Sequence, residues 1–60
     1  MKIGSTVEVI KITDLSDAKE VKHTIGMRGK VYAKQMNLCM VEFDTKECYC
    51  YSTFELEEVV

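Results

Sequence analysis

Three cysteines and one histidine are the residues of this sequence whose types most readily do chemistry. Cys39, Cys48, Cys50 and His23 match the number of ligands in a Cys3His zinc site. The spacing Cys-x-Cys differs from the paired knuckle that wraps a tetrahedral ion, and alternation along a strand points Cys48 and Cys50 the same way. We therefore expect no metal, no disulfide and no cofactor, and we place the thiols in the core.

Catalysis has little support in the sequence. His23 is the sole histidine, and the acidic residues near it, Asp17 and Glu20, belong to a segment without a fixed geometry. A single loop histidine is most often a solvated residue. The segment "GMRG" is too short for a phosphate-binding loop and does not open a helix. The sequence therefore predicts no catalytic residues and a protein that is not an enzyme.

Length and composition predict one small globular domain, residues 1–60. Sixty residues lie near the lower limit for a chain that folds alone, and the 47% hydrophobic and 30% charged residues exclude a disordered chain. The apolar runs are too short to span a membrane, and the N-terminal segment lacks the apolar stretch of a signal peptide. An odd number of cysteines fits a reducing compartment. We expect a cytoplasmic protein without membrane contact.

The elements that must position these residues are short strands. Density of β-branched residues predicts a first strand over 6–13, and an excursion over 14–29 follows, with a short helical turn over 17–22 or an irregular loop. Further strands are expected over 30–34, 38–43 and 48–52. A helical turn started by Ser52 or Thr53 then leads to a brief fifth strand.

The segments "KIGSTVEVI", "IGMRGKVYA", "MVEF" and "STFELEEVV" resemble the pattern of small SH3-like barrels. These include the small stromal subunit of photosystem I and translation-type KOW domains. The resemblance implies an all-β fold, a five-stranded SH3-like barrel with a long loop after the first strand and a helical turn before the last. Because the chain has no tryptophan and the excursion lacks an acidic and aromatic cluster, binding of proline-rich peptides is not implied. The fold itself serves unrelated functions.

The turns fix which side chains share a face of the sheet. A two-residue turn at 45–46 and a four-residue loop at 44–47 both pair Val41 with Cys50 and Met40 with Tyr51. A three-residue turn at 35–37 pairs Tyr32 with Met40. The core predicted from this register comprises Val7, Val9, Val31, Ala33, Cys39, Val41, Phe43, Cys48, Cys50, Phe54, Leu56 and Ile3.

The opposite face gathers aromatic and methionine side chains that we predict to bind a protein partner. Tyrosine and methionine are enriched at interface centres, and contiguous exposed apolar patches mark contact sites. The alternative is that these side chains only stabilise the sheet. We expect a protein-binding module that forms a homodimer, and we expect Tyr51→Glu or Met40→Glu to leave the fold intact while abolishing binding. The predicted partner-binding residues are Tyr32, Leu38, Met40, Tyr49 and Tyr51.

Three further functions remain open from the sequence. Small size and acidic character fit an inhibitor of a host enzyme encoded by a phage or mobile element, and an accessory subunit of an enzyme complex is equally compatible. Binding of RNA or DNA is the other alternative, with Tyr32 and Tyr49 stacking on bases. The net charge of −2 and the acidic stretch "ELEE" weigh against it. Its basic residues would be Lys22, Arg28, Lys30 and Lys34.

Overall fold

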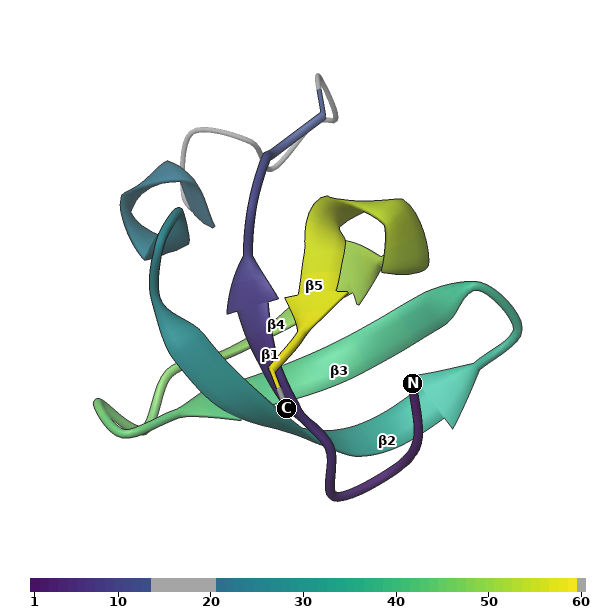
Figure 1. Ribbon diagram of the computed structural model, residues 1–60. Helices are drawn as coiled ribbons and strands as arrows, with labels where there is room; N and C mark the ends of the chain where they lie inside the picture. The colour runs from purple at the N-terminus through teal and green to yellow at the C-terminus, as the bar shows by residue number, and fades with distance from the viewer. Residues whose placement is uncertain (14–20, 60) are drawn as a thin grey trace.

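The computed structural model describes residues 1–13 and 21–59 as five antiparallel strands with two short 3-10 helices (Figure 1). The strand order in the sheet is β4-β3-β2-β1-β5. The protein is therefore all-β, as predicted, and the sheet is not closed by pairing of β4 with β5 among the described residues, so the barrel stays a prediction. The predicted turn over 17–22 falls mostly outside the described residues. The elements are β1 (Thr6–Val9), η1 (Lys22–Thr24), β2 (Arg28–Gln35), β3 (Leu38–Phe43), β4 (Cys48–Ser52), η2 (Thr53–Glu55) and β5 (Leu56–Glu58).

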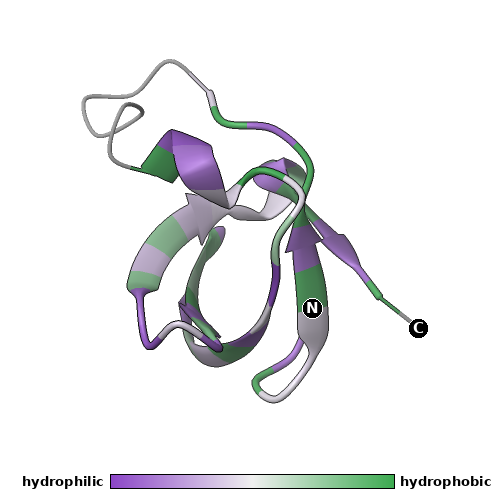
Figure 2. Cartoon of the chain, turned by 90° about the vertical axis from the view of Figure 1, so that its left-hand side faces the viewer, coloured by the Kyte–Doolittle hydropathy of each residue, from purple (hydrophilic) through white to green (hydrophobic). Residues whose placement is uncertain are grey.

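Hydrophobic and hydrophilic residues alternate along strands of the sheet (Figure 2), and the burial pattern of β3 shows that this alternation gives one buried face and one exposed face. In β3, every second residue is buried, which is the period-2 pattern of a strand with one wet face. Gly29 on β2 lies where the strands approach most closely, because a Cβ there would meet Glu42 O at 2.6 Å and Phe43 Cδ1 at 2.9 Å. Only glycine allows this approach without moving β3.

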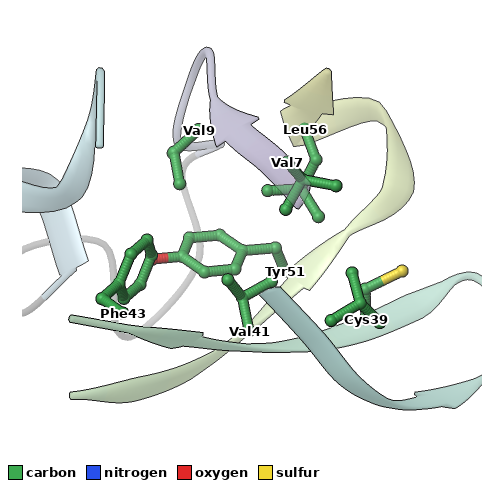
Figure 3. Packing of buried hydrophobic residues seen from close by; sticks show 8 residues of the cluster. Val7, Val9, Cys39, Val41, Phe43, Tyr51 and Leu56 are labelled. Carbon is green, nitrogen blue, oxygen red and sulfur yellow. The ribbon is translucent and has the colours of Figure 1, made fainter. Parts of the chain in front are cut away.

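The core lies on the inner face of the sheet, with Tyr51 at its centre (Figure 3). The Tyr51 ring meets Phe43 edge-on, with 6.2 Å between ring centroids, which is a favourable aromatic geometry. Seven predicted core residues are confirmed, but the placement of Cys48, Cys50, Phe54 and Ile3 in the core is wrong, since all four are exposed, and Ala33 is half-buried. The buried hydrophobic residues are Val7, Val9, Val31, Cys39, Val41, Phe43, Tyr51 and Leu56.

The β3–β4 turn explains the main error in the predicted register. The Phe43 amide donates to Glu47 O at 2.9 Å, and the Lys46 amide donates to Phe43 O at 2.9 Å. Three residues, 44–46, therefore lie between the closing pair Phe43 and Glu47. Lys46 has a positive φ of 74°, as in a type I turn followed by a left-handed residue. An odd loop shifts the register by one residue relative to the even loops expected from the sequence, and such a slip turns every side chain of β4 to the other face.

The resulting pairs place β4 opposite to its predicted orientation. Met40 pairs with Cys50 instead of Tyr51, and Cys39 pairs with Tyr51. Tyr51 thus enters the core, and its hydroxyl lies 2.7 Å from Thr24 Oγ1. The two thiols predicted to be buried on this strand point to solvent.

The β2–β3 hairpin also differs from its predicted pairing. Val31 pairs with Val41 as predicted, but the register shifts between Val31 and Ala33, so Met40 pairs with Ala33 and not with Tyr32. A two-residue turn at 36–37 closes the hairpin, and Met36 has a positive φ of 53°. The bulge absorbs one residue, which keeps both Tyr32 and Met40 on the exposed face.

A buried carboxylate fixes the last helical turn against the segment that follows β1. Glu55 accepts hydrogen bonds from the Ser52 amide at 2.7 Å and from the Thr13 amide and hydroxyl at 2.7 and 2.8 Å. Burial raises the pKa of Glu55, but the Thr13 and Ser52 donors outweigh it and hold the pKa below its usual value. Ser52 and Glu55 form a capping box, which confirms Ser52 as the start of η2.

Candidate docking surface on the outer face

The outer face is the side of β2, β3 and β4 that points away from the core, and it carries a group of exposed apolar side chains. Tyr32, Leu38 and Met40 are 44%, 45% and 39% exposed. Met36, in the turn between the strands, is 87% exposed. We call these four residues the hairpin patch. Exposed apolar side chains grouped on one element mark contact sites more often than single ones do.

The structure brings only part of the predicted partner-binding set to this surface. Tyr32, Leu38 and Met40 share the outer face as predicted, but the placement of Tyr49 and Tyr51 there is wrong. Tyr51 is 1% exposed, and Tyr49 is half-buried and packs against the core. Their displacement follows from the one-residue register slip described above.

The sequence also missed residues that the outer face presents. The sequence predicts Met36 only as a turn residue, although an apolar side chain at a hairpin tip has no core to enter. Cys48 and Cys50 take the places that the predicted register gave to tyrosines. Which face these residues occupy depends on whether the β3–β4 turn has an even or an odd number of residues. The sequence "DTKE" does not determine this number.

Tyr32 links the hairpin patch to the thiols of β4. Its hydroxyl lies near the Cys48 thiol. Desolvation raises the pKa of Tyr32, and the nearby Cys48 thiol and Glu42 carboxylate raise it further. The phenol therefore stays protonated and acts as a hydrogen-bond donor on the outer face.

On the inner side, Glu47 organises a cluster that joins the β3–β4 turn to η1. Its carboxylate accepts from the Tyr49 hydroxyl at 2.7 Å and from the Thr45 hydroxyl at 2.8 Å. His23 Nε2 lies 2.7 Å from Glu47 Oε2. The bonds from Tyr49, Thr45 and His23 lower the pKa of Glu47 to about 2. We call this cluster the carboxylate clamp, because the hydrogen bonds to Glu47 hold the β3–β4 turn in place and connect it to η1.

A pocket of about 310 Å³ opens beside the N-terminal half of β2. Its charges are mixed: Arg28, Lys30 and Lys46 face Glu42 and Asp44. Arg28 Nε also donates to Glu8 at 3.0 Å. Such a balanced lining does not select an anion or a cation, so the pocket defines no ligand class. Its full lining is Thr6, Arg28, Gly29, Lys30, Glu42, Phe43, Asp44 and Lys46.

The residues predicted for nucleic-acid binding are partly engaged within the chain. Arg28 is paired with Glu8, and the Lys34 ammonium donates to Met1 O at 2.7 Å. Lys22 is exposed on η1, and Lys30 lies in the pocket of mixed charge. Nucleic-acid binding stays a prediction, and two of its four basic residues, Arg28 and Lys34, already bind groups of the chain itself.

The four residues considered for zinc do not share a site. Cys39 is buried, Cys48 and Cys50 are exposed on the outer face, and the His23 ring contacts Glu47 and Tyr49. Within residues 1–13 and 21–59, no three His, Cys, Asp or Glu side chains are grouped to hold a metal ion. In the same part of the chain, no helix is long and apolar enough to cross a membrane.

Comparison with known proteins gives one structural relative. The sequence matches no known family, and no curated protein is similar to it. The fold is similar to the solution structure of PetP, a subunit of the cyanobacterial cytochrome b6f complex, with a TM-score of 0.84 and 25% sequence identity. The similarity covers 100% of this chain and 81% of the PetP chain. The five-stranded antiparallel sheet thus has a counterpart in a protein that works as part of a larger assembly.

Proposed function

We propose that this protein is a non-enzymatic accessory subunit that docks onto a larger protein complex of the cytochrome b6f kind. The single observation that carries the proposal is the similarity to PetP over the whole chain. The proposal corresponds to the accessory-subunit alternative from the sequence. The homodimer and the phage or mobile-element inhibitor receive no support from the structure or the comparisons. The cytoplasmic location predicted from the sequence is retained as part of the proposal.

The hairpin patch is the docking surface in this proposal. It covers the half of the β2–β3 hairpin nearer the turn, and this turn points away from η1 (Figure 1). Tyr32 and Met40 expose large side chains on the surface of the folded protein. Tyrosine and methionine are enriched at the centres of protein interfaces. A 60-residue chain also gains stability when a partner covers apolar surface that it cannot bury itself.

Leu38→Glu tests the surface, with Ile25→Glu as its matched control. Leu38 and Ile25 are both 45% exposed, but Ile25 follows η1 and lies outside the hairpin patch. Tagged wild-type protein and both variants are incubated with purified, detergent-solubilised cyanobacterial cytochrome b6f complex, and retention is measured after circular dichroism has confirmed folding. We expect wild type and Ile25→Glu to retain the complex and Leu38→Glu to lose it, because a charge would be buried in the interface.

Two outcomes contradict different parts of the proposal. If wild type fails to retain the complex, the assignment to a cytochrome b6f assembly is wrong. If wild type and Leu38→Glu retain it equally, the chain is a subunit but the hairpin patch is not its docking surface. The mass of the free chain, measured by light scattering, tests the homodimer separately, and a dimer split by Leu38→Glu alone would favour self-association through this patch.

A further inference from the structure

Three sulfur-bearing side chains share the outer face, an arrangement that the predicted register had hidden. Cys48 and Cys50 are two residues apart on β4 and are both exposed free thiols. Met40 on β3 is the register partner of Cys50 and is 39% exposed. Alternation along β4 puts both thiols on one face, and directly opposed residues of paired strands have Cβ atoms about 4.5–5.5 Å apart. All three sulfurs therefore belong to one small area of surface.

The chemistry of this set selects a soft metal ion. Soft thiolate and thioether ligands select Cu(I), zinc or iron–sulfur clusters, and iron–sulfur clusters are typically held by four cysteine thiolates, which this surface does not offer. Zinc requires four ligands of the Cys, His and carboxylate type in a closed structural site. No three such residues are grouped in the described part of the chain, so a complete zinc site is absent there. Cu(I) accepts a smaller number of sulfur ligands, and methionine serves as one of them.

The spacing is compatible with a shared ion. Residues two apart on a strand are separated by about 6.6 Å along the backbone. Metal–sulfur bonds of about 2.3 Å place two ligating sulfurs roughly 4 Å apart around a three-coordinate ion, and at most about 4.6 Å apart around a linear one. Rotation of two exposed cysteine side chains toward each other closes this difference, since neither thiol is held in the core. Cys39, which is fully buried, cannot take part.

We propose that Cys48, Cys50 and Met40 form a three-sulfur binding site for one Cu(I) ion on the outer face. On binding, the two thiols release their protons to solvent as two copper–thiolate bonds form, and the Met40 sulfur donates a lone pair. Copper remains Cu(I), so nothing is oxidised or reduced.

The inference does not rest on the proposed docking function, because the chain alone is tested. The reduced protein is titrated anaerobically with Cu(I) in competition with a chromophoric Cu(I) chelator, and the copper–thiolate absorption is followed in the ultraviolet. The variants are Cys48→Ser, Cys50→Ser and Met40→Leu, all at exposed positions, with Cys39→Ala as the control. A parallel titration with Zn²⁺ alone tests the choice of metal, and circular dichroism verifies that each variant is folded.

We expect wild type and Cys39→Ala to bind one Cu(I) per chain. Cys48→Ser and Cys50→Ser should weaken binding by more than about a hundredfold, which exceeds the ~10–100-fold effect of losing a supporting group. Met40→Leu should weaken it about tenfold. The proposal is overturned if either serine variant binds like wild type, if Met40→Leu has no effect, if Zn²⁺ binds as tightly as Cu(I), or if one ion is shared by two chains.

Discussion

The Tyr51 hydroxyl lies 2.7 Å from Thr24 Oγ1 in the interior of the protein and joins β4 to η1. Thr24 donates its own hydroxyl proton to Val21 O at 2.5 Å, so Tyr51 is the donor in the bond between them. Both side chains are at most 1% exposed. Burial raises the pKa of Tyr51, which keeps the phenol protonated and the bond intact over the physiological range.

Removing the Tyr51 hydroxyl tests this bond directly. We expect Tyr51→Phe to lower the free energy of unfolding by about 1 kcal/mol, because the Thr24 oxygen loses its buried donor while the ring packing is kept. In a domain of this size that corresponds to a fall in Tm of about 4–8 °C. Tyr32→Phe, on the exposed outer face, is the control and should change stability by less than about 0.5 kcal/mol. Equal effects of the two variants would contradict the inner placement of Tyr51.

For the Tyr51→Glu variant, the structure predicts the opposite of what the sequence predicts. The sequence predicted an intact fold, but a carboxylate replacing a side chain that is 1% exposed has no cationic partner among the buried residues that the structure describes. The total stability of a 60-residue domain is only about 3–9 kcal/mol. We therefore expect this variant to be unfolded, with loss of the β-sheet signal in far-ultraviolet circular dichroism. Met40→Glu, an exposed substitution on the outer face, should keep that signal.

The strands were predictable because their alternating residues carry a strong signal. The valines of β1 and the pattern of β3 point to one buried face whatever the turns do. β3 has its predicted bounds, whereas β1 ends at Val9, four residues before the end predicted from the density of β-branched residues. The 3-10 turn before β5 was predictable from a different signal, because Ser52 followed three residues later by Glu55 forms a capping box.

The face of β4 could not be predicted, because it depends on the parity of one turn. In "CYCYS", cysteine and tyrosine are both compatible with a core, so the strand's own pattern does not choose between faces. The three-residue turn that sets the face has Lys46 at positive φ. Lysine rarely adopts this conformation, so its presence in the sequence does not indicate such a turn. This one turn places the tyrosines of β4 on the inner side of the sheet and its thiols on the surface. The predicted docking surface therefore loses two of its residues.

Lys46→Gly should stabilise the β3–β4 turn. Lys46 has a φ of 74°, which costs an ordinary L-residue roughly 1–2 kcal/mol, whereas glycine accepts it freely. After the entropy that glycine loses on folding, we expect a net gain of about 0.5–1 kcal/mol, seen as a higher midpoint in urea. Thr45→Gly, at the preceding position of the same turn, serves as the control and should lower the midpoint. A loss of stability in Lys46→Gly would argue against the three-residue loop.

Glu47 should make stability depend on pH in the acidic range. Its pKa is lowered from 4.5 to about 2 by hydrogen bonds from Tyr49, Thr45 and His23. A lowered folded-state pKa contributes stability that is present above pH 4.5 and is lost as the pH falls toward 2. We expect Glu47→Gln to destabilise the protein at pH 7 and to differ less from wild type at pH 3, as measured by urea unfolding.

The control for this pH dependence is Glu57→Gln, an exposed position on β5. Its difference from wild type should not shrink in the same way between pH 7 and pH 3. If Glu47→Gln instead shows a constant difference across the range, the carboxylate clamp between the turn and η1 is not formed in solution.

Thiol reactivity distinguishes the two registers of β4 without any mutation. In the structure, Cys48 and Cys50 are exposed and Cys39 is fully buried. We expect a chromogenic disulfide reagent to modify two thiols per chain rapidly and the third only at the rate of unfolding, since burial denies the reagent access to the thiol. Peptide mass mapping should locate the protected thiol at Cys39. The register predicted from even turns buries all three cysteines, so three slow thiols in the native protein would restore it and return the tyrosines to the surface.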